Sequence, residues 1–540
     1  MNPSAAQSCT LPYRRFLICK NLNGSRRSAV RTIADCKSAI QHSATLRYAG
    51  LRVRTSNALS LLAFLPLIVL TACKVGPDYH RPSALAADTV PTSFSATTNA
   101  SDWKPASPAA NLPRGAWWEV FGDAELDRLE NLGGANNQQI AGALARFDQA
   151  RASVNVQRAN LFPQVELDPS YTRQRTSANQ PDNGHPAGAG YTFNTFTLQL
   201  QAGWEVDLWG RVRRQVESAR AQLRASSDDL ESVRLALQAE LAADYFTLRA
   251  LDAEFDLLTR TAETYRRSLD LTVNRRKGGI ATDLDVSQAQ TQLRATEAQL
   301  PALQLQRAKL VHAIATLSGQ SAADFELKKE TREQGGIPDY PISLPSELLE
   351  RRPDIASAEQ RMAAANAQVG VAQSAFYPRV RLNGLAGLQS LDASTWFDWP
   401  SRFWAVGPSL QMPLFTGGLN RAQLAVARAS YDETVANYRQ TVLTAFQEVE
   451  DQLASGNLLN SQLKAEAAAV EAAQRTLEIA NNRYKAGLVT YLEVAIAQGA
   501  ALDLERTTVQ LRGQKLVAAV GLIKALGGGW QAPQDQTVMK

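Results

Sequence analysis

The chain has 540 residues, 45% of them hydrophobic, which is enough for several domains and a sizeable core. Residues 1–72 hold ten of the 57 Lys and Arg residues but one of the 52 acidic residues, so the remaining 47 basic and 51 acidic residues give −4 instead of the overall +5. No basic face with interleaved aromatic residues is visible, and the charge therefore gives no reason to expect a nucleic-acid partner.

Residues 1–72 are interpreted as an N-terminal extension followed by a signal peptide. Arg52 and Arg54 precede an apolar run from Ala58 to Leu70, which is too short to span a bilayer comfortably. Three of the four cysteines lie in this part. If it is removed, Cys73 is the only cysteine left, and no intrachain disulfide can form.

The end of the apolar run resembles a bacterial lipoprotein signal, because small residues precede Cys73. The resemblance implies that Cys73 is lipidated and begins the mature chain, whereas a transmembrane anchor or a buried Cys is the alternative. Lys74 stands where an Asp would retain a lipoprotein in the inner membrane, which implies sorting to the outer membrane. Residues 73–115 are predicted to be a lipidated, extended tether, since they become rich in Pro, Ala, Ser and Thr.

Beyond residue 115 the same succession of elements occurs twice, which is an internal repeat. Each copy has a helix that stops at an aromatic residue and Pro, then two β-like segments, then a long helical hairpin. The helices are predicted at about Asn137–Leu161 and Asp354–Phe376. The first repeat is predicted at 116–319, with strands in 164–207 and a hairpin at 208–319. The second repeat is predicted at 347–528, with strands in 378–414 and a hairpin at 415–528. A linker around the waist at 320–346 joins them, and a tail follows at 529–540.

The β-like segments alternate between apolar and polar residues. The segment Phe193–Asp207 is the clearest example, and the others are expected at 165–176, 380–388 and 403–414. Each has about the length of a tilted membrane strand, with one apolar face and aromatic residues near its ends. A soluble antiparallel sheet with one solvated face is the alternative.

The hairpins are predicted from apolar residues that recur every three or four positions. An unbroken helix from Arg211 to Arg276 would be about 100 Å long, which suits a rod or a tube better than a compact domain. The return arms are expected at Leu284–Leu317 and from Leu492 to Leu526. A soluble coiled coil fits this pattern as well.

Each hairpin tip carries the residues of a helix stop and a helix start. Gly279 and Gly487 are predicted to end the first helices in a left-handed conformation. Capping boxes are predicted to begin the second helices. They are Thr282-x-x-Asp285 and Thr490-x-x-Glu493.

Membrane strands must close so that no edge is left unpaired. Four strands per chain are too few, because small closed barrels need about eight or more. A symmetric oligomer must therefore share the barrel, and the sequence by itself permits two, three or four chains. The expected fold class is an α+β membrane protein with long helical hairpins and four amphipathic strands per chain.

Three stretches resemble the TolC-like outer membrane factors, in particular the RND-type efflux lipoproteins related to NodT and OprM. They are CKVGPDYHRP from residue 73, WWEVFGD from residue 117 and LPSELLERRPDI from residue 344. The resemblance implies a homotrimer with a shared twelve-stranded barrel in outer-membrane lipid and a periplasmic α-helical tube. It also implies two partners, a periplasmic adaptor (membrane fusion protein) and an inner-membrane RND pump.

The function implied is passive conduction of small solutes out of the cell. A channel for type I protein export and, from another class, a periplasmic coiled-coil adaptor are the alternatives. No cofactor is expected besides the lipid on Cys73, and no catalysis, because the four histidines lack metal-ligand spacing and no phosphate-binding or nucleophile-elbow motif occurs.

In similar channels a Tyr and acidic residues at the tips constrict the tube. The matching positions are Tyr484, Glu493 and Asp285, which makes them candidate gate residues. Ile496 and Val489 stand where those relatives have a second acid and an Arg, so a less charged constriction is expected. A capping role for the acids is the alternative.

Overall fold

The computed structural model describes residues 74–84, 115–179, 190–329 and 351–528. All of them belong to one compact unit, Cys73–Lys540. The predicted signal peptide, Cys73, most of the tether, most of the linker and the tail lie outside the described residues.

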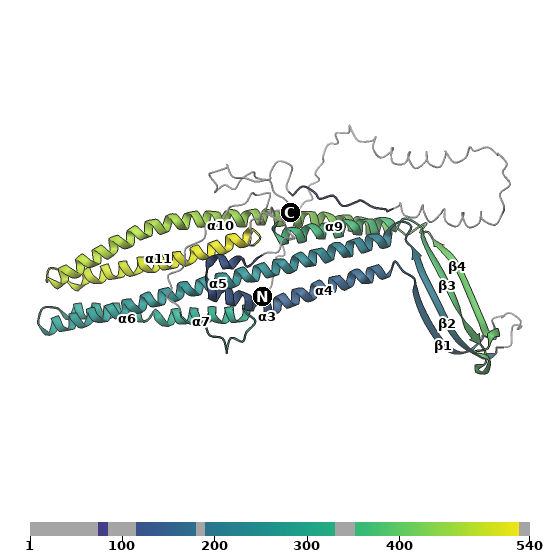
Figure 1. Ribbon diagram of the computed structural model, residues 1–540, viewed down its shortest axis with the longest axis horizontal. Helices are drawn as coiled ribbons and strands as arrows, with labels where there is room; N and C mark the ends of the chain where they lie inside the picture. The colour runs from purple at the N-terminus through teal and green to yellow at the C-terminus, as the bar shows by residue number, and fades with distance from the viewer. Residues whose placement is uncertain (1–73, 85–114, 180–189, 330–350, 529–540) are drawn as a thin grey trace, which may run out of the picture. The chain divides into compact units, whose positions relative to one another are not determined.

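The described helices form two hairpins with shorter helices beside them (Figure 1). The first half contains η1 (Trp117–Phe121), α3 (Ala124–Asn136), α4 (Gln138–Ala159), α5 (Arg211–Lys277), α6 (Asp283–Glu297) and α7 (Leu300–Leu317). The second half contains α9 (Pro353–Ser374), α10 (Leu419–Lys485) and α11 (Tyr491–Ala525). Helices α5 and α10 have 67 residues each, which corresponds to about 100 Å.

The first return arm is two helices, so the prediction of one unbroken helix from Leu284 to Leu317 was wrong. Pro301 lies in the first turn of α7 and has no N–H to donate to the carbonyl of Glu297. Just before it, the backbone N–H of Gln299 donates to Thr296 O at 3.2 Å, which is a tighter turn than an α-helix makes.

Helix α5 holds the two hairpins together, because it packs against α4, α6 and α7 on one side and α9 and α11 on the other. Trp117, Tyr245 and Val520 are buried in one cluster that joins η1, α5 and α11. The Tyr245 hydroxyl donates to Asp123 Oδ2 at 2.7 Å, and Asp123 caps the start of α3. This cluster, the largest of four among the described residues, lies between the hairpins about midway along α5.

The four predicted strands are confirmed and form one antiparallel sheet in the order β1-β2-β3-β4. They are β1 (Gln164–Arg175), β2 (Thr192–Val206), β3 (Arg379–Ser390) and β4 (Arg402–Gln411). The prediction that the last strand reaches Leu414 was wrong, since the pairing ends at Arg379 and Gln411. Pro413 cannot donate to a ladder, which accounts for the early end.

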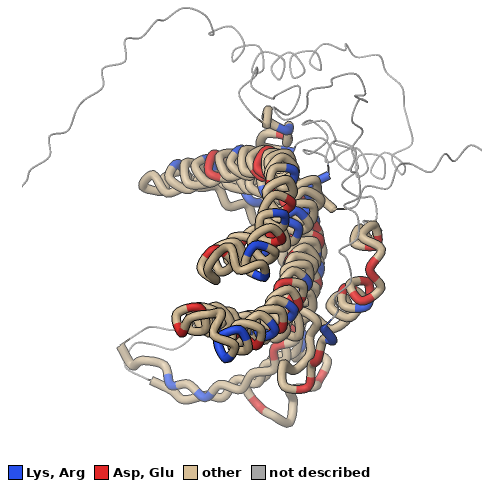
Figure 2. The backbone as a smooth tube through the Cα atoms, turned by 90° about the vertical axis from the view of Figure 1, so that its left-hand side faces the viewer, with Lys and Arg blue, Asp and Glu red and all other residues tan. Residues whose placement is uncertain are grey.

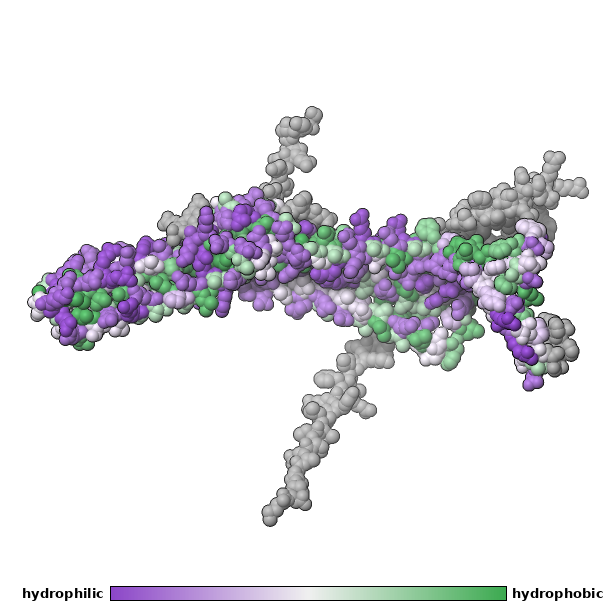
Figure 3. Space-filling model, turned by 90° about the horizontal axis from the view of Figure 1, so that it is seen from below, coloured by the Kyte–Doolittle hydropathy of each residue, from purple (hydrophilic) through white to green (hydrophobic). Residues whose placement is uncertain are grey.

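The two faces of the sheet differ sharply. The strand registers show which residues share a face. One face carries Leu167, Leu200, Ala386 and Trp404, and the opposite face carries Glu166, Gln201 and Leu385. Figure 3 shows hydrophobic residues gathered at the sheet end, while hydrophilic residues cover most of the hairpins. Among the described residues, no helix has both the length and the apolar character to span a bilayer.

The residues after Cys73 lie along the helices as a docked segment, residues 74–84. Arg214, which is 1% exposed, donates to Val75 O at 3.2 Å and to Gly76 O at 2.9 Å. Gly76 has φ +101°, and a Cβ there would lie 2.5 Å from the Cα of Gly370. The docked segment thus begins beside the junction of β2 and α5, where the Val75 N–H donates to Trp209 O at 3.1 Å.

Candidate functional site

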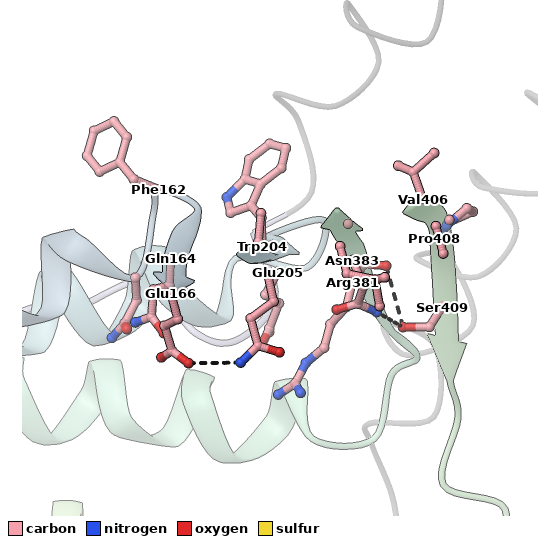
Figure 4. A pocket seen from close by; sticks show the side chains of 18 of the residues that line it. Phe162, Gln164, Glu166, Trp204, Glu205, Arg381, Asn383, Val406, Pro408 and Ser409 are labelled. Carbon is pink, nitrogen blue, oxygen red and sulfur yellow. Dashed lines mark hydrogen bonds between the residues drawn. The ribbon is translucent and has the colours of Figure 1, made fainter. Parts of the chain in front are cut away.

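The polar face of the sheet forms one wall of a cavity of about 970 Å³ next to the start of α5. In Figure 4, Glu166, Glu205 and Arg381 extend to one side of the strands, and Trp204 and Val406 extend to the other. Gln201 Nε2 donates to Glu166 Oε2 at 3.1 Å, which links the polar side chains of two strands. The strand alternation therefore separates an apolar surface from a polar one.

Charged groups gather where this polar face meets the helices. Arg211 donates to both carboxylate oxygens of Glu205 at 2.8 Å. Arg381 lies opposite Glu205 in the register of β2 and β3, and Arg379 precedes it on the same face. With three arginines around one carboxylate, the junction carries positive charge. Among the described residues, no group of three His, Cys, Asp or Glu side chains could hold a metal ion.

The hairpin tips end as the sequence predicted. Gly279 and Gly487 have φ +72° and +76°, and both therefore adopt the left-handed conformation that favours glycine. The N–H groups of Ile280 and Leu488 return to the carbonyls of Arg275 and Arg483 at 2.8 and 3.0 Å. Figure 2 looks at the tips and shows acidic and basic residues mixed on both hairpins.

One of the two predicted capping boxes is present. The Thr282 hydroxyl accepts from the Asp285 N–H, and Asp285 Oδ2 accepts from the Thr282 N–H at 2.8 Å. The box predicted at Thr490 and Glu493 was wrong, because Thr490 makes no side-chain cap. Instead, Asp285 Oδ1 accepts from the N–H of Tyr491 at 3.0 Å. One carboxylate from the first hairpin therefore caps helices of both hairpins.

Tyr484 is buried in the same contact between the hairpins. Its hydroxyl donates to Thr272 Oγ1 at 3.3 Å, and the Arg275 guanidinium lies 4.8 Å from its ring centroid. Arg275 also donates to Lys485 O at 3.0 Å, and Tyr491 packs edge-on against Tyr484 at 5.5 Å. The side chains of Thr272, Arg275 and Tyr484 thus fasten the end of α5 to the tip of the second hairpin.

The candidate gate residues do not all meet. Tyr484 and Asp285 both belong to the contact between the hairpins, through Tyr491. The side chain of Glu493 is 51% exposed and lies 3.6 Å from Arg483. Sequence reasoning missed Thr272, Arg275 and Tyr491, because their partners are distant in the chain and no local pattern marks them.

Hydrogen bonding keeps the Asp285 carboxylate charged. Burial acts to raise its pKa, but hydrogen bonds from the Thr282 backbone and hydroxyl and from the Tyr491 backbone outweigh burial and lower the pKa below its usual value. The cap is therefore made by an ionised carboxylate at neutral pH.

Comparison with known proteins agrees with this architecture. The family model described as outer membrane efflux protein matches residues 133–320 and 344–528. The chain is 33% identical to the probable efflux pump outer membrane protein TtgC of Pseudomonas putida over 484 residues, which cover 89% of this chain and 97% of TtgC. It is also 33% identical over 489 residues to the outer membrane protein OprJ of Pseudomonas aeruginosa, with 89% and 98% covered.

Solved structures agree as well. The outer-membrane channel OprN superposes with a TM-score of 0.77 at 32% identity, covering 85% of this chain and all of that one. The VceC outer membrane protein of Vibrio cholerae gives a TM-score of 0.71 at 31% identity, with 79% and 100% covered.

The fold is that of an outer-membrane channel of efflux systems. The chain belongs to the outer membrane efflux protein family, among the RND-type outer membrane factors, as the three sequence stretches indicated. Its place is the outer membrane, with a large periplasmic portion.

Replacing Asp285 by Asn should loosen the contact between the hairpin tips. A hydrogen bond to a charged group contributes about 1.5–3 kcal/mol, so amide hydrogen exchange at Tyr491 should accelerate about tenfold or more. The matched control is Asp283→Asn, two positions earlier, where the exposed carboxylate pairs with Arg276 of its own hairpin. Equal exchange at Tyr491 in both variants would contradict the double cap.

Proposed function

We propose that three copies of this chain form one passive exit duct, with a shared twelve-stranded barrel in the outer membrane and a helical tube in the periplasm. A periplasmic adaptor and an inner-membrane RND pump would feed small solutes into it. The main support is the sheet itself, which has one apolar face and one polar face because successive residues of each strand point to opposite sides.

The edges of the sheet support a shared barrel. Within the described residues, β1 pairs with β2 alone and β4 pairs with β3 alone. An open strand edge inside lipid leaves backbone groups without partners, which costs several kcal/mol for each group. Pairing β4 of one copy with β1 of the next satisfies both edges and closes the ring. Three copies, as in the resemblance, would give the twelve strands.

The two halves of the chain are proposed to be copies of one unit. Each half gives a helix, two strands and a hairpin whose first helix has 67 residues. The family model also matches the chain twice, once in each half. Three chains would then contribute six equivalent units to one tube.

The alternatives account for less of the molecule. The hypothesis of a periplasmic coiled-coil adaptor does not explain why the sheet has an exposed apolar face that includes Trp404 and Val406. Export of folded or unfolded proteins would use the same architecture. The efflux assignment is favoured by relatives such as TtgC, which is named as an efflux pump component.

The proposal is tested by assembly and transport together. In mild detergent the mature protein should have three times the mass of one chain, and it should form channels in planar bilayers. In cells that lack their own outer membrane factor, the protein expressed with its adaptor and pump should lower the accumulation of a fluorescent pump substrate. A stable monomer with full strand content, or no conductance, would contradict the duct.

Lipidation of Cys73 is proposed from its signal-like context, and the docked segment supports it. That segment begins beside Trp209, at the end of the helices that adjoins the sheet. An acyl anchor one residue before this segment would start from the end of the helices that adjoins the sheet. Buried Arg214 holds the segment through Gly76 O and Asp78 Oδ1, at 2.9 and 3.1 Å.

Replacing Cys73 by Ser should abolish incorporation of radiolabelled fatty acid, since the thioether needs the sulfur. One acyl chain anchors a protein only marginally, and the barrel should keep the variant in the membrane fraction. Label on the Ser variant would rule out this site of lipidation.

A gate at the hairpin tips is the third part of the proposal. Helix α5 begins five residues after β2 and runs for 67 residues, so its tip lies far from the sheet, where a pump-side partner would meet it. Tyr484 and Asp285 hold the tips together, and Glu493 offers a half-exposed carboxylate. Like carboxylates around a narrow pore favour cations and resist closing.

Glu493→Gln should change the conductance or reduce the cation selectivity of the channel in planar bilayers. It leaves the caps intact, because Glu493 does not cap α11. The double variant with Asp285→Asn should also open more readily, because the loss of the charged cap on the Tyr491 N–H weakens the contact that holds the tips together. Unchanged conductance and selectivity in the double variant, with lower thermal stability, would mean that the two acids have a structural role alone.

A further inference from the structure

The apolar face of the sheet carries charge at one end. The registers assign Arg173 and Arg175 of β1 to the same face as Leu167, and Arg402 of β4 to the same face as Leu388. These three are the charged residues of that face among the described strands, and all are arginines. The strand carboxylates Glu166, Asp168 and Glu205 lie on the polar face.

The three arginines lie at the far end of the sheet from the helices. Arg173 and Arg175 are among the last three residues of β1, and Arg402 is the first residue of β4. The Arg402 guanidinium lies 4.3 Å from the ring centroid of Trp399, in the loop that precedes β4. We call these three residues the arginine rim.

Aromatic residues mark the border between the apolar band and the rim. Tyr171 packs on Phe196 at 4.9 Å, and Phe196 packs on Trp396 at 5.6 Å. From Val165 to Tyr171 the strand covers about 20 Å, and Arg173 lies about 7 Å further on, at about 3.4 Å per residue. The order along the strand is therefore apolar, aromatic and basic, which places the rim at headgroup depth.

No protein carboxylate neutralises the rim within the part of the chain that the structure describes. All three side chains are exposed, and the ion pairs of the described residues involve other arginines. In the loop before β4, Asp392 accepts hydrogen bonds from the N–H and hydroxyl of Ser394. Among the described residues, the rim therefore has no carboxylate counter-charge.

We propose that the arginine rim binds the phosphate groups of lipids in the outer leaflet. A guanidinium matches phosphate with two parallel hydrogen bonds, and a basic residue near the interface of a barrel is far less unfavourable than one at the bilayer midplane. The site rests on the proposed barrel. Pairing β4 of one copy with β1 of the next would bring Arg402 beside Arg173 and Arg175, so each subunit boundary would hold one site.

The test compares two variants of the full-length protein. In the rim variant, Arg173, Arg175 and Arg402 become Gln. In the control, Arg379 and Arg381 become Gln, which removes arginines from the polar face of the same sheet. Both proteins are extracted from native membranes in mild detergent, and native mass spectrometry counts the phosphorylated outer-leaflet glycolipid that each retains. Binding is repeated after delipidation, with that glycolipid, with its dephosphorylated form and with inorganic phosphate as competitor.

The rim variant should retain at least fivefold less phosphorylated lipid than the wild type, and the control should retain as much as the wild type. The dephosphorylated lipid should bind the wild type as weakly as the phosphorylated lipid binds the rim variant. Millimolar inorganic phosphate should not displace the lipid.

Equal retention by the rim variant, an equal loss in the control, or displacement by inorganic phosphate would overturn the inference. Oligomer mass and conductance are measured on the same samples. A rim variant that assembles and conducts yet retains its lipid would refute the rim and leave the duct intact, whereas a wild type that forms neither oligomer nor channel would refute the duct itself.

Discussion

The unpaired edges of the four-stranded sheet are the constraint on which the rest of this structure depends. The chain supplies strands with a hydrated face and an apolar face, but within the described residues β1 and β4 pair on one side only. In lipid such edges must find partners. In the proposed duct, the sheet is a fragment of a larger closed barrel, and the helices that leave it are arranged around the same axis.

The long helices extend from the sheet to the hairpin tips. Helix α5 contacts elements of both hairpins. Two polar contacts stabilise the packing of the helices, one near the sheet and one at the hairpin tips. Buried Arg214 fixes the docked segment beside the sheet, and Asp285 caps helices of both hairpins at the tips. In each contact a charged side chain bonds backbone atoms of a segment that is distant in the sequence.

Local patterns predicted a large part of the fold because they act over short distances. Alternation gave all four strands, and Gly279 and Gly487 adopt the left-handed conformation that the tip pattern indicated. The predictions failed where a single residue or a distant contact overrode the local pattern. Pro301 interrupts a run with good helical periodicity. At the second tip the predicted capping box does not form, and Asp285 of the first hairpin accepts a hydrogen bond from the Tyr491 N–H.

The sequence by itself determined the strands, the long helices, their turns and the family, since periodicity, turn residues and motifs are local. The tertiary structure decided which side chains meet across the hairpins. Arg275 lies 210 residues from Lys485, and Arg214 lies more than 130 residues from the segment that it holds. No local pattern encodes such pairs, because their contact depends on how two helices of about 100 Å align side by side.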